Sequence, residues 1–176
     1  MSGYNYGVYL NGGWHSGFGP AFRTINPSQP KVAVGTYSSA SRDQIADLVA
    51  SSNAAQQGWR AIPPLERIAR FGKYLTALEG KSEQLAISIT LEQGKPLAEA
   101  RAEVAKAIAE ARVTAGAASH GLGEVLPSAR LGIRNLVIRR PRGTIVAISP
   151  WNFPILTPMR KLAPAVIYGN AIILKP

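Results

Sequence analysis

Apolar and polar positions divide the chain into three stretches with different periodicities. Residues 1–38 contain short apolar runs separated by turn residues, such as Tyr6–Leu10 followed by Asn11–Gly13, and predict short strands. Residues 41–118 space their apolar side chains three and four positions apart, which predicts helices. After Gly121 the apolar residues form short continuous runs, which predict strands again. The pattern therefore predicts an α/β fold with a helical layer in its middle.

Local signals delimit four helices within the second stretch. Ser41–Gln44 has the spacing of a capping box at the start of the first helix. Pro63–Pro64 opens the second helix, and Ser82 is expected to cap the third. Gly94 ends the third helix and Pro96 opens the fourth, which has an alanine-rich apolar stripe. Such a stripe predicts close packing against other helices.

The last 34 residues predict a strand, a loop, a helix and a second strand. Thr144–Ile148 and Ala171–Leu174 are apolar runs of the kind expected for strands buried on both faces, and Pro158–Tyr168 between them has helical periodicity. This order is that of a βαβ unit with a right-handed crossover. Because one such unit is an incomplete doubly wound sheet, we expect the chain to be a truncated form of a larger fold.

The cysteine and histidine counts limit the possible chemistry of the 176 residues. The chain has no cysteine, which excludes disulfides, thiolate metal sites and a cysteine nucleophile within it. Two histidines, His15 and His120, give no basis for a histidine-rich metal site, and we expect no metal.

The net charge of +10 is concentrated near the end of the chain. Residues 1–124 carry twelve basic and ten acidic side chains, a net of +2, whereas residues 125–176 carry eight basic side chains and no acidic one. A basic nucleic-acid-binding module is one explanation, but no aromatic-rich basic strand or paired Cys/His motif accompanies the charge. The distribution therefore favours a chain whose acidic complement lies in a missing segment or in a partner, and argues against nucleic acid.

No segment of the sequence resembles a membrane anchor or a secretion signal. The longest apolar runs fall well short of the ~20 residues that a spanning helix needs, and the first residues lack a basic region followed by an apolar one. The expectation is a cytoplasmic protein without membrane association.

Candidate chemistry lies in the loop that follows the first strand of the βαβ unit. In open α/β sheets, ligands bind beyond the carboxyl ends of the strands. Asn152, within Ser149–Pro154, is placed there and can donate an amide hydrogen bond to a developing oxyanion. Lys175 follows the next strand and can reach a ribose hydroxyl or a phosphate. Alternatively, Asn152 bonds to backbone, as loop asparagines commonly do, and Lys175 is a solvated terminal charge.

Four blocks together resemble the signature of the aldehyde dehydrogenase superfamily: Pro150-Trp151-Asn152-Phe153-Pro154, Lys161-Leu162-Ala163-Pro164-Ala165, Gly169-Asn170 and Lys175-Pro176. Further segments in the family's order and approximate spacing extend the resemblance over most of the chain: Ile25–Pro27, Trp59–Arg60, Arg67, Leu91–Leu97 and Glu103–Val104. Gly123–Ser128, followed by a strand, resembles the semialdehyde dehydrogenase branch.

The resemblance implies roles for individual residues. Asn152 matches the asparagine whose amide stabilises the oxyanion, and Ile148, Ser149, Pro150 and Trp151 match the strand-end segment that lines the NAD or NADP site. Lys175 matches the lysine that contacts the adenosine ribose. The strands near residues 125–141 match a hairpin used in oligomerisation. The implied fold is the N-terminal portion of the family's fold, divided into residues 1–122 (strands and helical layer), 123–142 (oligomerisation strands) and 143–176 (the first βαβ of the cofactor domain).

Two departures from the family pattern affect activity. The cysteine nucleophile and the general-base glutamate are both missing, and without a thiolate no thiohemiacetal forms. We therefore expect the chain to be inactive alone, with weak or no binding of NAD or NADP. The alternative is a non-catalytic homo-oligomer that associates through the open strand edge and apolar surface. Glu92 and Lys95, near a helix end, are expected to be surface or capping charges.

Overall fold

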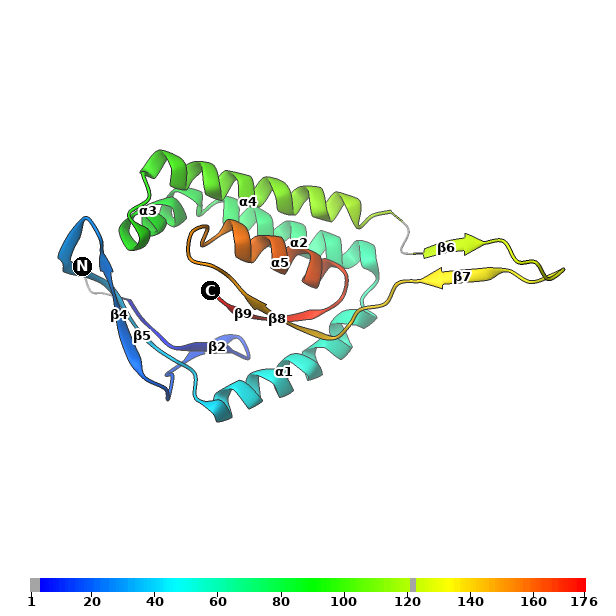
Figure 1. The fold of residues 1–176 in the computed structure, drawn as a ribbon, viewed down its shortest axis with the longest axis horizontal. Helices are drawn as coiled ribbons and strands as arrows, with labels where there is room; N and C mark the ends of the chain where they lie inside the picture. Colours follow the sequence, from blue (N-terminus) through cyan, green and yellow to red (C-terminus); the bar gives the residue numbers. More distant parts are fainter. Residues whose placement is uncertain (1–3, 121–122) are drawn as a thin grey trace.

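The computed structural model describes residues 4–120 and 123–176. Its central body is a group of helices packed over a small parallel sheet, with separate small sheets at the two ends (Figure 1). The predicted change from helices to strands after Gly121 falls at residues 121–122, which lie outside the described residues. The predicted α/β class is confirmed.

Short strands form the N-terminal part of the chain. A three-stranded sheet has the order β1-β5-β4, with β1 parallel and β4 antiparallel to β5, and a separate hairpin joins β2 to β3. The strands are β1 (Tyr4–Tyr6), β2 (Val8–Leu10), β3 (Gly13–His15), β4 (Ala21–Asn26) and β5 (Gln29–Ser38).

Four helices follow, and most of their predicted ends are confirmed. They are α1 (Arg42–Ala61), α2 (Pro64–Glu79), α3 (Ser82–Gln93) and α4 (Leu97–Ala117). The capping box is present: the Gln44 amide donates to the Ser41 hydroxyl, and the Ser41 amide donates to the Gln44 side chain. Gly94 ends α3 in the left-handed conformation. The expected cap at Ser82 is wrong, because Lys81 occupies the cap position and the Ser82 hydroxyl donates to the Glu79 carbonyl instead.

The main hydrophobic core joins α2 and α4 to α5 (Leu156–Ile167). The predicted alanine stripe of α4 is buried, with Ala107 and Ala111 in this core and Ala100 in a second cluster against α3. Small side chains let the helices approach closely. As a result, α5 is fixed against the helical layer that precedes it in the sequence.

The predicted βαβ unit is present. Strands β8 (Thr144–Ile148) and β9 (Ala171–Lys175) are parallel, and α5 connects them. The expectation that β8 is buried on both faces is wrong: Ala147 packs inward, but Val146 is 62% and Ile148 65% exposed. The reason is that this sheet has only two strands among the described residues, so no further strand covers β8. Helix α1 does reach the start of β8, where the Thr144 hydroxyl bonds to the Asn53 side chain at 2.7 Å.

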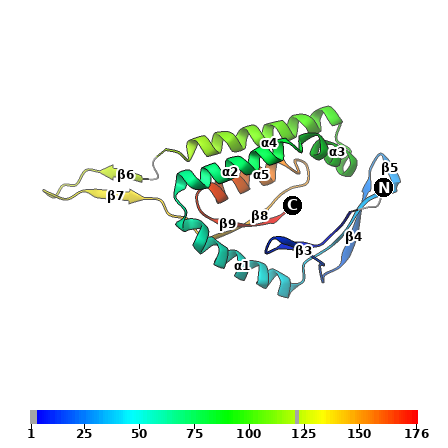
Figure 2. The ribbon, with the colours of Figure 1, turned by 180° about the vertical axis from the view of Figure 1, so that it is seen from behind.

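A two-stranded hairpin projects from the helical body (Figures 1 and 2). It consists of β6 (Gly123–Leu126) and β7 (Asn135–Ile138), paired antiparallel. All eight strand residues are exposed, including Val125 and Leu136. The strands expected near residues 125–141 are thus present as two short strands joined by a longer connection.

Candidate functional site at the carboxyl end of β8

The parallel register of β8 and β9 brings the predicted site residues to one edge. Ile148 pairs with Lys175, and the Ser149 amide donates to the Lys175 carbonyl at 3.1 Å. The loop Ser149–Pro154 leaves the sheet from this point and leads into α5. The juxtaposition of this loop with the end of β9, predicted from the strand order, is confirmed.

Most of the loop faces solvent, and the side chain of Asn152 has no hydrogen-bond partner among the described residues. Pro150, Trp151 and Asn152 are exposed. Hydrogen bonds within the described residues involve the backbone carbonyl of Asn152 and not its side-chain amide. The alternative in which this amide bonds to backbone is therefore wrong. The amide is available to a ligand at the carboxyl end of β8.

Ser149 and Lys175 are the polar groups at the sheet edge itself. Ser149 is 7% exposed, and its hydroxyl has no hydrogen-bond partner among the described residues. The Lys175 ammonium is exposed and donates to the adjacent Pro176 carbonyl at 2.6 Å. A buried hydroxyl without a partner next to an exposed cation is a donor set that fits the hydroxyl and phosphate groups of a dinucleotide.

Lys95 lies under the loop and is not a surface charge. Its ammonium donates to the Asn152 carbonyl at 3.0 Å, pairs with the Glu103 carboxylate and lies 4.5 Å from the centre of the Phe153 ring. The side chains of Lys95 and Glu103 are 11% and 1% exposed. The expectation that Lys95 is a surface or capping charge is therefore wrong, because the loop, which is distant in sequence, covers it.

Glu103 connects the helical layer to the start of α5. One carboxylate oxygen accepts hydrogen bonds from the amides of Ile155 and Leu156, at 2.9 and 3.2 Å, and the other accepts from Lys95. The sequence did carry a signal for this residue. Glu103 lies one helical turn from Ala100 and Ala107, so a carboxylate occupies the buried face of α4.

The opposite end of α5 is held by side chains of α1 and α2. Gln56 donates to the Gly169 carbonyl at 3.0 Å, Trp59 to Val166 at 2.7 Å and Arg67 to Ile167 at 3.0 Å. Burial lowers the pKa of the Arg67 guanidinium from its ordinary value.

Some of the basic side chains near the end of the sequence are paired within the fold. Arg160 forms a two-pronged ion pair with Glu110 on α4, at 2.5 and 2.7 Å. The hydrogen bond and charge of Arg160, together with Lys106, lower the pKa of Glu110. Lys161 donates to the Ile148 carbonyl at the end of β8. Two of the eight basic residues after position 124 are thus engaged within the fold.

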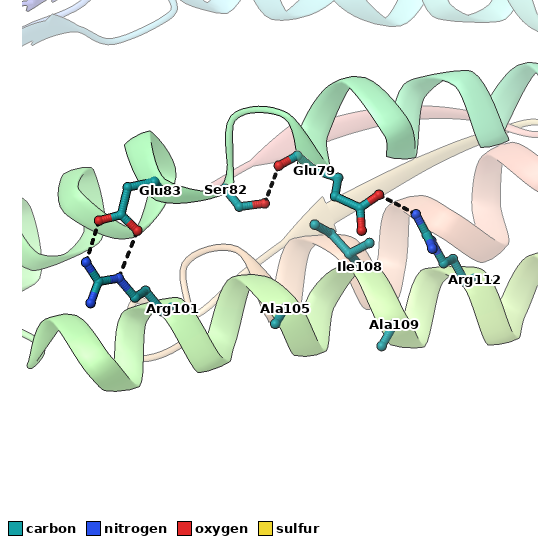
Figure 3. A pocket seen from close by; sticks show the side chains of 8 residues that line it. All are labelled: Glu79, Ser82, Glu83, Arg101, Ala105, Ile108, Ala109 and Arg112. Atoms are coloured by element: carbon teal, nitrogen blue, oxygen red, sulfur yellow. Dashed lines mark hydrogen bonds and ion pairs between the residues drawn. The ribbon is translucent and has the colours of Figure 1, made fainter.

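A separate pocket of about 250 Å³ lies beside α3 and α4 (Figure 3). Its charged side chains are paired with each other, since Arg101 binds Glu83 and Arg112 binds Glu79, both at 2.5 Å. The pocket thus presents paired charges, and none of its lining residues belongs to the loop. Within residues 4–120 and 123–176, no three acidic or histidine side chains are grouped to hold a metal ion, and no helix has the length and apolar character for crossing a bilayer.

Comparison with known proteins places this arrangement in a family. The sequence model of the Aldehyde dehydrogenase family matches residues 14–176. Alpha-ketoglutaric semialdehyde dehydrogenase of Bacillus subtilis is 34% identical over 169 residues, which cover 96% of this chain and 35% of the relative. The chain thus spans about a third of the length of the curated relatives that it matches.

Solved structures of the family superpose closely on the fold. A structure from Sinorhizobium meliloti, assigned as a methylmalonate-semialdehyde dehydrogenase and complexed with NAD, has a TM-score of 0.92 at 32% identity, covering 100% of this chain and 36% of that one. The NADP-dependent glyceraldehyde-3-phosphate dehydrogenase of Bacillus halodurans, complexed with NADP, has a TM-score of 0.91 at 30% identity, covering 98% and 37%. The resemblance that the sequence motifs indicated is confirmed, and this chain belongs to the aldehyde dehydrogenase family.

Proposed function

We propose that this chain supplies the oxyanion-binding loop and one edge of the NAD(P) site of an aldehyde dehydrogenase that oxidises a semialdehyde to the carboxylic acid. The semialdehyde class is suggested by the curated relative from Bacillus subtilis. The observation that carries the proposal is the position of the Asn152 side-chain amide, which lies beyond the carboxyl end of β8 without a hydrogen-bond partner among the described residues. The backbone of the same residue is held by a hydrogen bond from Lys95 to its carbonyl.

Asn152 is assigned the role of oxyanion donor. When a nucleophile attacks the aldehyde carbon, negative charge develops on the carbonyl oxygen. A side-chain amide fixed at that oxygen stabilises the charge without having to reorganise. Removing one such donor typically lowers kcat by about 10²–10³-fold.

Ile148, Ser149, Pro150, Trp151 and Lys175 are assigned to the cofactor. Ser149 would donate its unpartnered hydroxyl and Lys175 its ammonium to the dinucleotide, while the exposed Ile148 and Trp151 would pack against it. NAD or NADP, when bound, supplies the acceptor for the substrate hydride. These residues form only part of a dinucleotide site, so the chain alone is expected to bind NAD(P) weakly or not at all. A low-micromolar dissociation constant by calorimetry would contradict that expectation.

The 176-residue chain is expected to be inactive alone, because it contains no cysteine to form the thiohemiacetal. The purified chain should therefore give no reduced cofactor with a panel of semialdehydes, and steady NAD(P)H formation would disprove this part of the proposal.

A chimera tests the positive role of the loop. This chain would replace the matching segment of the Bacillus subtilis α-ketoglutaric semialdehyde dehydrogenase, so that the remainder of that enzyme supplies the expected nucleophile. The Asn152→Ala variant of an active chimera should have a kcat roughly 10²–10³-fold below that of the unsubstituted chimera, with little change in KM. Equal kcat values for the two proteins would refute the oxyanion role.

The projecting hairpin supports a second function, self-association. Val125, Leu136 and Ile138 are 61–66% exposed, and Leu131 at the tip is fully exposed. Apolar side chains on an open two-stranded ribbon favour pairing with another copy. We expect light scattering to show a homo-oligomer that Leu136→Lys weakens. A monomer at ~10 µM would contradict this second function.

A further inference from the structure

A buried ion pair lies directly beneath the loop that carries Asn152. We propose that Lys95 and Glu103 are positioning residues that set the conformation of residues 151–156 and so determine where the Asn152 side chain lies. The inference deepens the proposed function, because it rests on the oxyanion role assigned to Asn152.

Every strong hydrogen-bonding group of the pair is directed at the loop or at its partner. The Lys95 ammonium has three partners: the Glu103 carboxylate, the Asn152 carbonyl and the face of Phe153. The two oxygens of Glu103 divide their bonds between Lys95 and the amides of Ile155 and Leu156. A buried polar network that is fully satisfied in this way specifies one geometry, because any other leaves a charge unpaired.

The contacts fall on both sides of Asn152. Gln93, at the end of α3, donates to the Trp151 carbonyl at 2.9 Å, just before the Lys95 bond to the next carbonyl. Glu103 fixes the backbone three and four residues later. The main chain is therefore held on each side of Asn152, while its side-chain amide remains free to meet a ligand.

Stability alone does not account for a pair of this kind. Replacing a buried ion pair by well-packed apolar side chains is often neutral or stabilising, since desolvation offsets much of the attraction. What an apolar pair cannot provide is a carboxylate that accepts the two amides at the start of α5 and an ammonium that binds a loop carbonyl. Orientation of the loop is therefore the effect to measure.

The test uses the 176-residue chain, isotope-labelled for NMR, and compares local with global change. Glu103→Gln keeps an acceptor for the two amides but removes the charge, while Lys95→Met keeps the length of the side chain but removes its donors. Lys95→Arg restores a cation. The matched controls are Glu110→Gln, on the same helix but outside the loop contacts, and Lys73→Met, an exposed position of α2. The readouts are amide exchange, the side-chain amide resonance of Asn152 and the global unfolding free energy.

Glu103→Gln should speed exchange of the Ile155 and Leu156 amides roughly tenfold or more, since charged hydrogen bonds are the stronger ones. This acceleration should exceed any change in the exchange rates of the slowest core amides, because those amides exchange only through global unfolding. Lys95→Met should broaden or shift the Asn152 side-chain resonance, and Lys95→Arg should restore it in large part. The two controls should leave these signals in place.

Unchanged loop signals in Lys95→Met, or acceleration by one common factor across the whole core, would overturn the positioning role. If Glu103→Gln fails to fold, the two Lys95 variants decide the question. Neither result depends on catalysis. A chimera that is insensitive to Asn152→Ala, combined with a loop that responds to Lys95→Met, would therefore refute the proposed function and leave the positioning role standing.

Discussion

The two ends of α5 are both anchored by buried side chains of the helical layer, but with opposite chemistry. At the first turn, the Glu103 carboxylate accepts two backbone amides and is itself paired with Lys95. At the last turn, the Arg67 guanidinium donates to backbone carbonyls and has no carboxylate partner in the described part of the chain. An anion at the start of a helix and a cation at its end both complement the helix dipole.

The difference lies in what each end carries. The first end continues backward into the exposed loop with Asn152, where a compensated ion pair sets a backbone conformation. The last end continues into β9 through Gly169 and Asn170, and the Asn170 side chain accepts from the amides of Arg142 and Gly143 before β8. Anchoring of the last end thus fixes the sheet, whereas anchoring of the first end fixes a candidate reactive group.

Removing the anion of the first end should have the largest effect. Glu103→Ala leaves the buried Lys95 ammonium without its counter-ion and two amides without an acceptor. We expect a loss of about 3–5 kcal/mol in the free energy of unfolding, measured by urea denaturation. The control is Glu99→Ala, an exposed position in the first turn of the same helix, where the change should stay below about 1 kcal/mol. Similar values for the two variants would show that the buried pair contributes no more than a surface charge.

Removing the cation at the last end of α5 should cause the second-largest loss in the free energy of unfolding. Arg67→Met leaves the carbonyls of Arg60, Ile62 and Ile167 without a donor, but it leaves no charge unpaired. A loss of about 2–4 kcal/mol is expected by the same measurement. Arg70→Met removes only an exposed pair with Glu66, four residues earlier on the same helix, and should cost about 0.5 kcal/mol or less. If Arg67→Met proved costlier than Glu103→Ala, the ranking of the two ends would be reversed.

A substitution in the turn after α5 tests whether the last end of this helix depends on the left-handed backbone conformation of Gly169. Gly169 has a φ of +86°, and an added Cβ would lie 3.0 Å from Pro141 and 3.3 Å from Arg67. Gly169→Ala is expected to cost about 1–2 kcal/mol, since the left-handed conformation disfavours a side chain. Gly72→Ala, within α2 and with no atom near the added Cβ, should instead stabilise by about 0.5–1 kcal/mol. A thermal melt series would compare the two, and equal shifts in Tm would contradict the conformational explanation.

Most of what the sequence predicted correctly depends on local pattern. The capping box at Ser41 and the helix end at Gly94 are set by neighbouring residues, and the order of β8, α5 and β9 follows from periodicity. The placement of Lys175 beside Ile148 follows from the rule that parallel strands end at one edge.

What the sequence did not predict depends on contacts between distant residues. Lys95 was expected at the surface because it lies near a helix end, and only the loop more than fifty residues later covers it. The exposure of Val146 was also not predicted. An apolar strand sequence predicts burial on both faces, but burial requires neighbouring strands and helices that the strand's own sequence does not reveal. For Asn152, the motif identified the residue, while the free amide and the anchored backbone became evident only in the folded chain.

The smallest expected effect concerns the exposed pair between α4 and α5, which lies between the two anchored ends. The hydrogen bond from Arg160 lowers the pKa of Glu110, so the pair stabilises the fold at pH values above the ordinary carboxyl pKa. That contribution is lost as the pH falls through the lowered pKa of the folded state. Glu110→Gln should therefore melt slightly below the parent chain near pH ~7, and the difference should vanish near pH ~2–3. Because exposed pairs are screened, added salt should reduce the difference at neutral pH as well. A difference that persists in acid would show that Glu110 acts through packing and not through its charge, and α5 would then have a third anchoring point besides its two ends.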